Sequence, residues 1–148
     1  MKDTLHYLLM ANHLTFQKIL FKGIKDTELT PGQPKVLDFL KIHNGAVQKE
    51  IAEASHIDPA TITFVLSGME KNNLIIRKKK DGNRRSIYVY LTEKGKEHAE
   101  YVEELFSTIE KKAFVGFETE EKELLIELLT RIYKNINEIK GEDFDVEK

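Results

Sequence analysis

The residues best suited to chemistry are the basic side chains between positions 71 and 85. Seven lysines and arginines lie there with one acidic residue, Asp81, which gives a net charge of +6. Residues 97–148 hold fifteen acidic and seven basic residues, a net charge of −8, while the whole chain carries −2. A segregated basic segment can bind a polyanion although the overall charge is acidic. The sequence therefore indicates a nucleic-acid interface, the alternative being an ordinary solvated hairpin.

Catalytic and metal-binding patterns are weak by comparison. The chain has no cysteine, which excludes disulfides, thiolate metal sites and cysteine nucleophiles. It also has no glycine-rich phosphate loop, nucleophile motif or paired-carboxylate constellation, so we expect no enzyme and no cofactor. No pair of its five histidines has the tight helical spacing typical of zinc sites. The sequence therefore predicts no metal site.

The composition is that of a globular protein. Of 148 residues, 41% are hydrophobic and 32% charged, which excludes wholesale disorder and suffices for the core of one domain. No stretch approaches the 18 or so uncharged apolar residues of a membrane span, so we expect no membrane partner. The N-terminus, residues 1–4, lacks the pattern of a signal peptide. We expect a soluble, cytoplasmic protein.

Apolar residues at spacings of three and four predict helices along most of the chain. A first helix is expected from Thr4 to about Gly23. The next is expected to start with Thr30 as N-cap, with Pro31 at the first helical position and Gln33 completing a capping box. Further helices are predicted at residues 48–55, at 58–72 with Asp58 as N-cap, at 92–116, and from an N-cap at residue 119 to 141.

Two β-rich runs lie between the fourth and fifth of these helices. Residues 75–77 and the alternating segment 86–91 flank the turn signal Asp81-Gly82-Asn83, which predicts a hairpin. Three short helices followed by a basic hairpin are the parts of a winged helix-turn-helix. Its second helix, beginning near Asp58, enters the major groove of DNA in such folds.

The helix-turn-helix pattern also holds in detail. Ala52 places a small residue where the two helices cross, Ile57 fills the turn, and Ile62 and Val65 face the core. His56 stands at a turn position often given to glycine, and histidine tolerates a positive φ better than most residues. The predicted fold class is therefore mainly α (α+β): a winged helix-turn-helix with a two-stranded antiparallel wing and dimerisation helices at both ends.

The chain resembles the MarR (multiple-antibiotic-resistance regulator) family of winged-helix transcription factors. The similar segments are Leu-Thr-Pro-Gly-Gln at 29–33, the run from recognition helix to wing at 66–77, and the wing motif at 83–95. Two positions depart from the family pattern. Asn83 stands where the family has a wing acid, and Phe64 replaces a frequent arginine, so the operator sequence is expected to differ from the common ones.

The resemblance implies a homodimeric, sequence-specific transcriptional regulator that binds a pseudo-palindromic operator in double-stranded DNA. It implies a repressor released by a small ligand. It also implies a single domain, with a DNA-binding core at 30–91, dimerisation helices at 1–23 and 92–141, and a frayed tail at 142–148. Two alternatives stay open: a winged-helix protein–protein interaction module without DNA binding, and terminal helices that merely cap a monomeric core. Because some members of the family sense zinc, the resemblance also leaves open a zinc site at which His43 and His98 meet beside carboxylates.

Two sets of site residues follow. The predicted DNA contacts are short polar, apolar and basic side chains of the helix-turn-helix and wing: Gln48, Pro59, Ala60, Thr61, Thr63, Phe64, Ser67, Lys79, Arg84 and Arg85. The predicted ligand crevice is aromatic with polar groups, as suits a small aromatic or amphipathic molecule: His13, Phe16, Phe39, His43 and Tyr101. The alternative for the second set is ordinary core packing.

Overall fold

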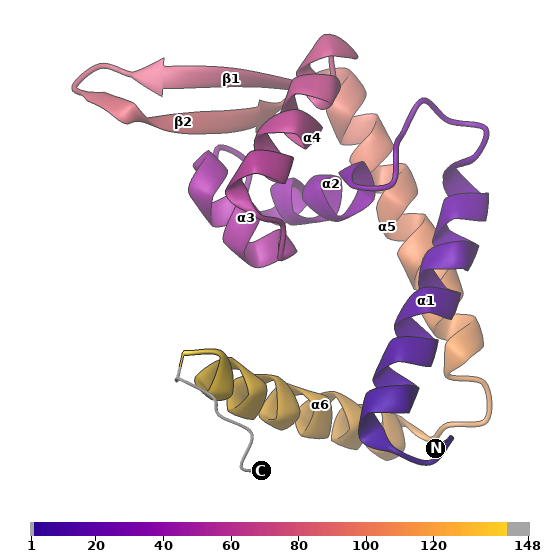
Figure 1. The fold of residues 1–148 in the computed structure, drawn as a ribbon. Helices are drawn as coiled ribbons and strands as arrows, with labels where there is room; N and C mark the ends of the chain where they lie inside the picture. The colour runs from indigo at the N-terminus through magenta and orange to yellow at the C-terminus, as the bar shows by residue number, and fades with distance from the viewer. Residues whose placement is uncertain (1, 142–148) are drawn as a thin grey trace. The chain divides into compact units, whose positions relative to one another are not determined.

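The computed structural model describes residues 2–141, without the side chains of residues 83 and 84, so the predicted frayed tail lies outside the described residues. The elements along the chain are α1 (Leu5–Ile24), α2 (Gln33–Ile42), α3 (Gln48–Ser55), α4 (Pro59–Lys71), β1 (Ile75–Lys80), β2 (Asn83–Leu91), α5 (Glu93–Ala113) and α6 (Thr119–Lys140) (Figure 1). They form two compact units, Met1–Ile109 and Glu110–Lys148. The predicted winged helix-turn-helix is confirmed. None of the described helices is both long and apolar enough to span a membrane.

The predicted start of α2 is wrong by two residues. Thr30 is not the N-cap: Gly32 holds that position, and Gln33 is the first helical residue. The reason is Pro34. In a helix capped by Thr30, residue 34 would be the first required to donate its N–H into the helix, and proline has none. Part of the predicted capping box survives, because Gln33 Oε1 accepts a hydrogen bond from the Thr30 N–H at 3.2 Å.

Of the three further predictions at helix ends, two are confirmed and one is wrong. Asp58 caps α4 as predicted, its carboxylate accepting from the Thr61 N–H at 2.9 Å. His56 takes the predicted left-handed conformation, with φ 52°. Thr119 is not the cap of α6, because Glu118 occupies that position. The Glu118 N–H donates to Glu121 Oε1 at 2.9 Å, a bond that requires the glutamate three residues beyond the cap.

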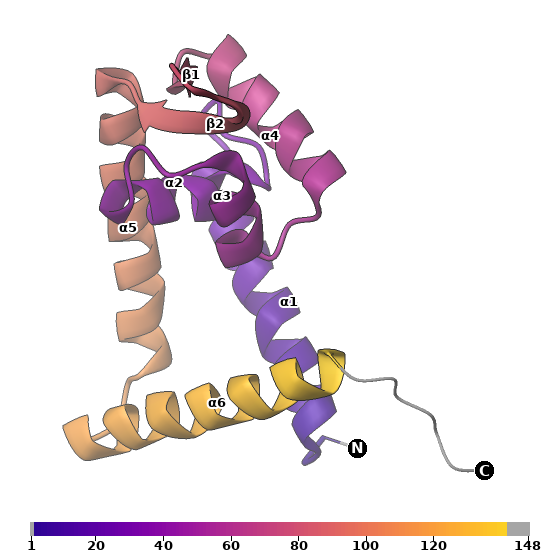
Figure 2. The same ribbon diagram turned by 90° about the vertical axis from the view of Figure 1, so that its left-hand side faces the viewer.

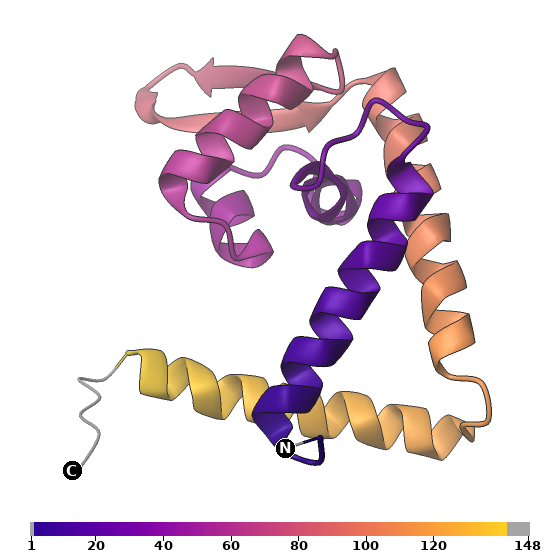
Figure 3. The ribbon, with the colours of Figure 1, turned by 45° about the vertical axis from the view of Figure 1, so that its right-hand side comes forward.

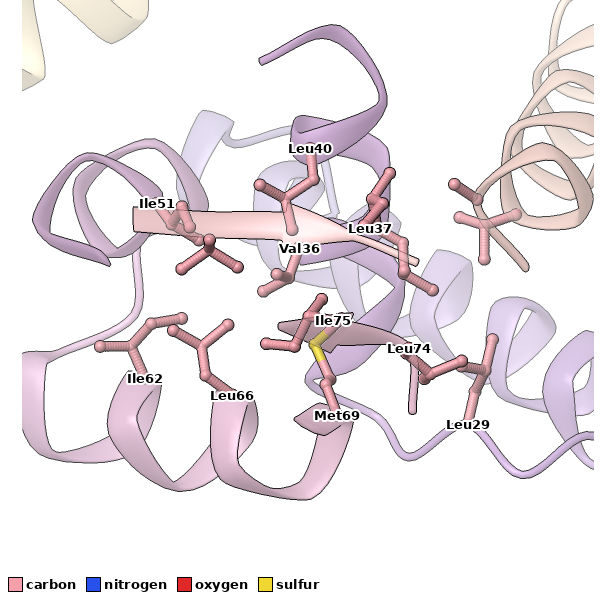
Figure 4. Packing of buried hydrophobic residues seen from close by; sticks show 14 of the residues in the cluster. Leu29, Val36, Leu37, Leu40, Ile51, Ile62, Leu66, Met69, Leu74 and Ile75 are labelled. Atoms are coloured by element: carbon pink, nitrogen blue, oxygen red, sulfur yellow. The ribbon is translucent and has the colours of Figure 1, made fainter. Parts of the chain in front are cut away.

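The core lies where α2, α3, α4 and the base of the hairpin meet (Figure 4). Ile51, Ile62 and Leu66 close the angle between α3 and α4 from inside, and Ala52 is buried as the crossing residue. Val65 and Ile57 are half-buried against the same cluster, as the helix-turn-helix pattern predicts. Because the inner face of α4 is taken by this packing, its other face is left outward.

The first half of α5 belongs to the same unit as the winged core. Ala99 and Val102 join the core cluster. Tyr101 of α5 donates a hydrogen bond to the backbone oxygen of Gly23 in α1. Phe16 of α1 stacks on Phe106 of α5, with ring centroids 6.0 Å apart. The two helices are therefore in contact along part of their length (Figure 3). The early part of α5 thus supports the DNA-binding core directly.

The hairpin is an antiparallel pair in which Ile75 faces Leu91 and Lys78 faces Tyr88. The register shifts at a bulge between Lys78 and Lys80. The segment before α3 pairs with β2 from its other side, because the Gly45 N–H donates to the Val89 oxygen at 2.8 Å. Asn44 Oδ1 accepts from the Leu91 N–H at 2.8 Å. These bonds fix the base of the hairpin, while its closed end projects beyond α3 and α4 (Figure 1).

Gly95, in the first turn of α5, lies against the backbone of Leu74 just before β1, and replacing it by alanine is expected to destabilise the protein strongly. A Cβ at this position would lie 1.9 Å from the backbone oxygen of Leu74. Backbone cannot rotate away as a side chain does, so we expect a loss of about 3 kcal/mol, the upper range for overpacking. Thermal unfolding measures it. Gly141→Ala is the control, since its Cβ would find only an ordinary contact at 3.5 Å; equal melting temperatures for the two variants would contradict the prediction.

Candidate nucleic-acid interface

The outward face of α4 carries most of the predicted DNA contacts. The exposed predicted residues of this helix are Pro59, Ala60, Thr61, Thr63, Phe64 and Ser67. Phe64 is 79% exposed, the extreme case for a large apolar side chain on this helix. The helix lies beside β1 of the hairpin (Figures 2 and 3). A helix face and a hairpin thus belong to one continuous part of the molecule.

The N-terminus of α4 is already occupied by an anion. Asp58 Oδ1 accepts from the Thr61 N–H at 2.9 Å, and Asp58 Oδ2 accepts from the Thr61 hydroxyl at 2.7 Å. The bond from the Thr61 side chain is the main reason that the pKa of Asp58 lies below its usual value. Asp58 is therefore ionised at neutral pH. Helix N-termini attract phosphate in general, but this carboxylate takes that position, so phosphate contacts must come from elsewhere.

Thr63 and Gln48 are coupled to each other. Gln48 Nε2 donates to Thr63 Oγ1 at 2.9 Å, and the Thr63 hydroxyl donates to the Pro59 oxygen at 3.0 Å. Gln48 Oε1 is buried and has no hydrogen-bond partner within the described part of the chain. The bond from α3 to α4 fixes the Thr63 hydroxyl, and its hydrogen points back into the helix. Two of the predicted contact residues therefore form one unit, which the sequence did not indicate.

Arg77, one of the basic residues between positions 71 and 85, binds a carboxylate of α4. Its Nε donates to Glu70 Oε2 at 3.1 Å, and its Nη2 donates to Glu70 Oε1 at 3.3 Å and to Ser67 Oγ at 3.3 Å. This two-pronged bond ties β1 to the outward face of α4, and it lowers the pKa of Glu70. Arg77 therefore neutralises a carboxylate at the interface. The seven-residue separation crosses a helix end and a turn, so no sequence periodicity could have revealed it.

Two lysines of β1 lie over tyrosine rings of β2. Lys78 Nζ lies 5.6 Å from the ring centroid of Tyr90, and Lys80 Nζ lies 4.2 Å from that of Tyr88. Such cation–π contacts limit the freedom of a flexible ammonium group. Lys79 and Arg85 are exposed. The side chain of Arg84 lies outside the described residues.

Four of the five residues predicted for a ligand crevice make ring contacts or a hydrogen bond within the protein, and the fifth is exposed. Phe16 stacks on Phe106, Phe39 stacks on His43 with centroids 4.6 Å apart, and Tyr101 bonds to Gly23. His13 lies exposed on α1. The structure thus pairs Phe39 with His43 and, separately, Phe16 with Phe106.

The histidine alternative gains no support. His98 Nδ1 lies 2.9 Å from the Lys94 backbone oxygen, and its Nε2 lies 3.5 Å from Glu28 Oε1, where Lys94 also binds at 2.6 Å. His43 is instead stacked on Phe39. Within residues 2–141, no three histidine, aspartate or glutamate side chains are grouped to hold a metal ion.

The chain is similar to known regulators over most of its length. Residues 29–87 match the MarR family. The uncharacterized HTH-type transcriptional regulator YybA of Bacillus subtilis (strain 168) is 30% identical over 112 residues, 76% of this chain and 75% of that protein. The HTH-type transcriptional repressor MdtR of the same strain is 35% identical over 83 residues, 54% of each chain. In structure, a MarR-family regulator from Listeria monocytogenes complexed with a 26mer DNA superposes with a TM-score of 0.88, covering 99% of this chain and 100% of that one at 24% identity, which shows the shared fold.

Proposed function

The chain belongs to the MarR family of DNA-binding transcriptional regulators, and from this premise we propose that it is a homodimeric repressor of a pseudo-palindromic operator. In this proposal α4 reads bases in the major groove and the hairpin contacts the phosphate backbone beside it. The proposed contacts are those predicted from the sequence, and Arg77, bonded to Glu70 and Ser67, positions α4. The repressor role rests on the similarity to MdtR, which is named a repressor. We place this activity in the cytoplasm.

The observation that carries the proposal is the division of charge between two adjacent surfaces. The outward face of α4 holds hydroxyl and apolar side chains, and Arg77 of the adjacent strand β1 is neutralised by Glu70. The hairpin beside it is strongly basic. Base contacts specify and phosphate contacts position, so a neutral reading helix next to a cationic hairpin suits sequence-specific DNA binding. A protein-binding winged helix, the alternative from the sequence, has no need of such cations.

Dimerisation is supported by the unit at residues 110–148. Along α6, no residue is buried. Its exposed apolar side chains recur at helical spacing: Leu124, Leu125, Ile126, Leu128, Leu129, Tyr133, Ile136 and Ile139. A continuous apolar stripe of this extent marks an interaction surface rather than a solvated one. A second copy of the chain is the partner that also supplies the second half-site reader.

Selection of bound duplexes from a random pool tests the function. We expect enrichment of an inverted repeat whose half-sites are about one helical turn apart, bound by two chains per duplex. Sedimentation of the complex gives the stoichiometry. Enrichment of a single half-site bound by one chain would contradict the operator, and the absence of any enriched sequence would contradict specific DNA binding itself.

We further propose that a small aromatic or amphipathic acid releases the repressor by binding beside Phe16, Phe39, His13, His43 and Tyr101. The stacked Phe39–His43 pair, with ring centroids 4.6 Å apart, offers an aromatic surface that also holds the two ring nitrogens of His43. A ligand acts only through its difference in affinity for the DNA-binding and released states. Thermal-shift measurement with phenolic acids checks this: a stabilising compound should also release DNA, and both effects should vanish in His43→Ala.

A further inference from the structure

The recognition helix α4 is unusual in what it lacks. Its thirteen residues, Pro59–Lys71, include no arginine, asparagine, glutamine or histidine, and its one lysine is the last residue. Direct readout of guanine relies mainly on arginine or lysine, and readout of adenine relies mainly on asparagine or glutamine. The first three turns of α4 have none of these side chains. Whatever sequence preference this helix has must come from hydroxyls and apolar groups.

Two of the three hydroxyls of α4, those of Thr61 and Thr63, are further restricted by their own hydrogen bonds. The Thr61 hydroxyl donates to Asp58, and the Thr63 hydroxyl donates to the Pro59 oxygen. A hydroxyl has one hydrogen to donate. Neither threonine therefore has a hydrogen left for guanine O6 or N7, the acceptors that distinguish a G·C pair. Each can still accept from a base amino group, which adenine and cytosine both have in the major groove.

The apolar component is dominated by Phe64. Its side chain is 79% exposed, and it lies three residues from Thr61 and from Ser67, on the same outward face. Ala60, four residues earlier and also exposed, adds a methyl group on this face. The one base feature that an apolar side chain can recognise in the major groove is the C5-methyl group of thymine. Burying a phenyl ring against any other base edge would leave donors or acceptors of that edge unpaired.

Resting on the proposed function, we propose that α4 selects A·T base pairs through the thymine methyl group and that Phe64 is the residue that determines this specificity. In this proposal Phe64 favours the thymine methyl group through an apolar contact. The Thr61 and Thr63 hydroxyls act only as acceptors, for the amino groups of bases. The cations of the hairpin supply affinity without regard to sequence. The operator half-site is therefore expected to place thymine opposite Phe64.

Replacing thymine by deoxyuridine removes the methyl group and leaves base pairing unchanged, so it isolates the proposed contact. On the selected operator, uridine at the matching thymine of both half-sites should weaken binding of the unaltered protein by about 16-fold, fourfold for each buried methyl group. Phe64→Ala should bind the thymine and uridine operators nearly equally. Fluorescence anisotropy at fixed salt gives both dissociation constants.

Two controls make the outcome decisive. Lys79→Ala, in the hairpin, should weaken binding to both operators by the same factor and keep the 16-fold ratio. Thermal unfolding of Phe64→Ala should be within about 2 °C of the unaltered protein, since exposed sites contribute little to stability. Equal binding of the unaltered protein to thymine and uridine operators at every position, or an undiminished ratio in Phe64→Ala, would overturn the proposal while leaving DNA binding intact. A chain that selects no duplex at all would overturn the proposed function as well.

Discussion

Replacing Leu128 and Ile136 of α6 together by aspartate is expected to convert the protein to a monomer at micromolar concentration. These side chains are 40% and 47% exposed and lie eight residues apart, on one face of the helix. Buried against a second copy, each contributes apolar area to the interface. Four charges per dimer would have to be desolvated there, which costs more than the lost contacts. Analytical ultracentrifugation measures the oligomeric state.

The same variant should bind the operator about 10²–10³-fold more weakly. A dimer holds its second reader at a high effective concentration over the second half-site, and gains of this order come from such linkage without any new contact. Thr130→Asp with Asn137→Asp is the matched control, because it adds the same charge to the opposite, polar face of α6. A variant that stays dimeric, or a monomer with undiminished operator affinity, would show that α6 does not build the DNA-binding dimer. Truncation would be a poorer test, since Ala99 and Val102 of α5 belong to the core.

Replacing Arg84 and Arg85 by alanine is expected to weaken binding to every DNA by about 100-fold and to flatten its salt dependence. Each phosphate contact releases condensed counterions and contributes about 0.9 to the slope of log K against log salt. With one phosphate per arginine in both wings, the slope should become shallower by about 3.6. Because phosphate contacts do not depend on base sequence, operator and random duplex should lose the same factor.

The control for the wing variant is Lys111→Ala with Lys112→Ala, which removes the same charge from the last turn of α5. We expect a much smaller change in slope, since these two lysines are not among the predicted phosphate contacts and only such contacts release condensed counterions. Binding is measured over a series of salt concentrations, chosen so that the dissociation constants of both variants can be determined. A loss confined to the operator would mean that the two arginines read bases, which would reverse the proposed division between wing and recognition helix.

Local sequence signals predicted the elements and several details of their ends. The repeat of apolar residues predicts each helix to within a few residues. The sequence also indicates Asp58 as the cap of α4 and a left-handed conformation at His56, and the structure has both. The errors at Thr30 and Thr119 are of the same local kind. In the first, a second proline, Pro34, moved the helix start; in the second, Glu118 and Glu121 satisfied the helix end one residue earlier.

The candidate site was predictable as a surface but not as a set of contacts. Exposure of Thr61, Phe64 and Ser67 followed from burial of the opposite helix face. The bonds from Arg77 to Glu70 and from Gln48 to Thr63 did not follow from any spacing. They changed the interpretation of the site: Arg77 positions α4, and the threonine hydroxyls lose their free hydrogens. The thymine-methyl proposal depends on that change.

The sequence by itself determined the order of helices and strands, the winged helix-turn-helix pattern and the separation of basic from acidic surface. These properties depend on neighbours within one or two turns of the chain, and the periods of 3.6 and 2 residues report them directly. Only the tertiary structure decided which polar groups meet. The Asn44 side chain accepts a hydrogen bond from the Leu91 N–H, 47 residues away, and Gly95 of α5 lies against the backbone of Leu74. Such contacts depend on how packed elements approach one another, and a hydrogen bond forms only within a few tenths of an ångström of its required distance, a precision that no local pattern specifies.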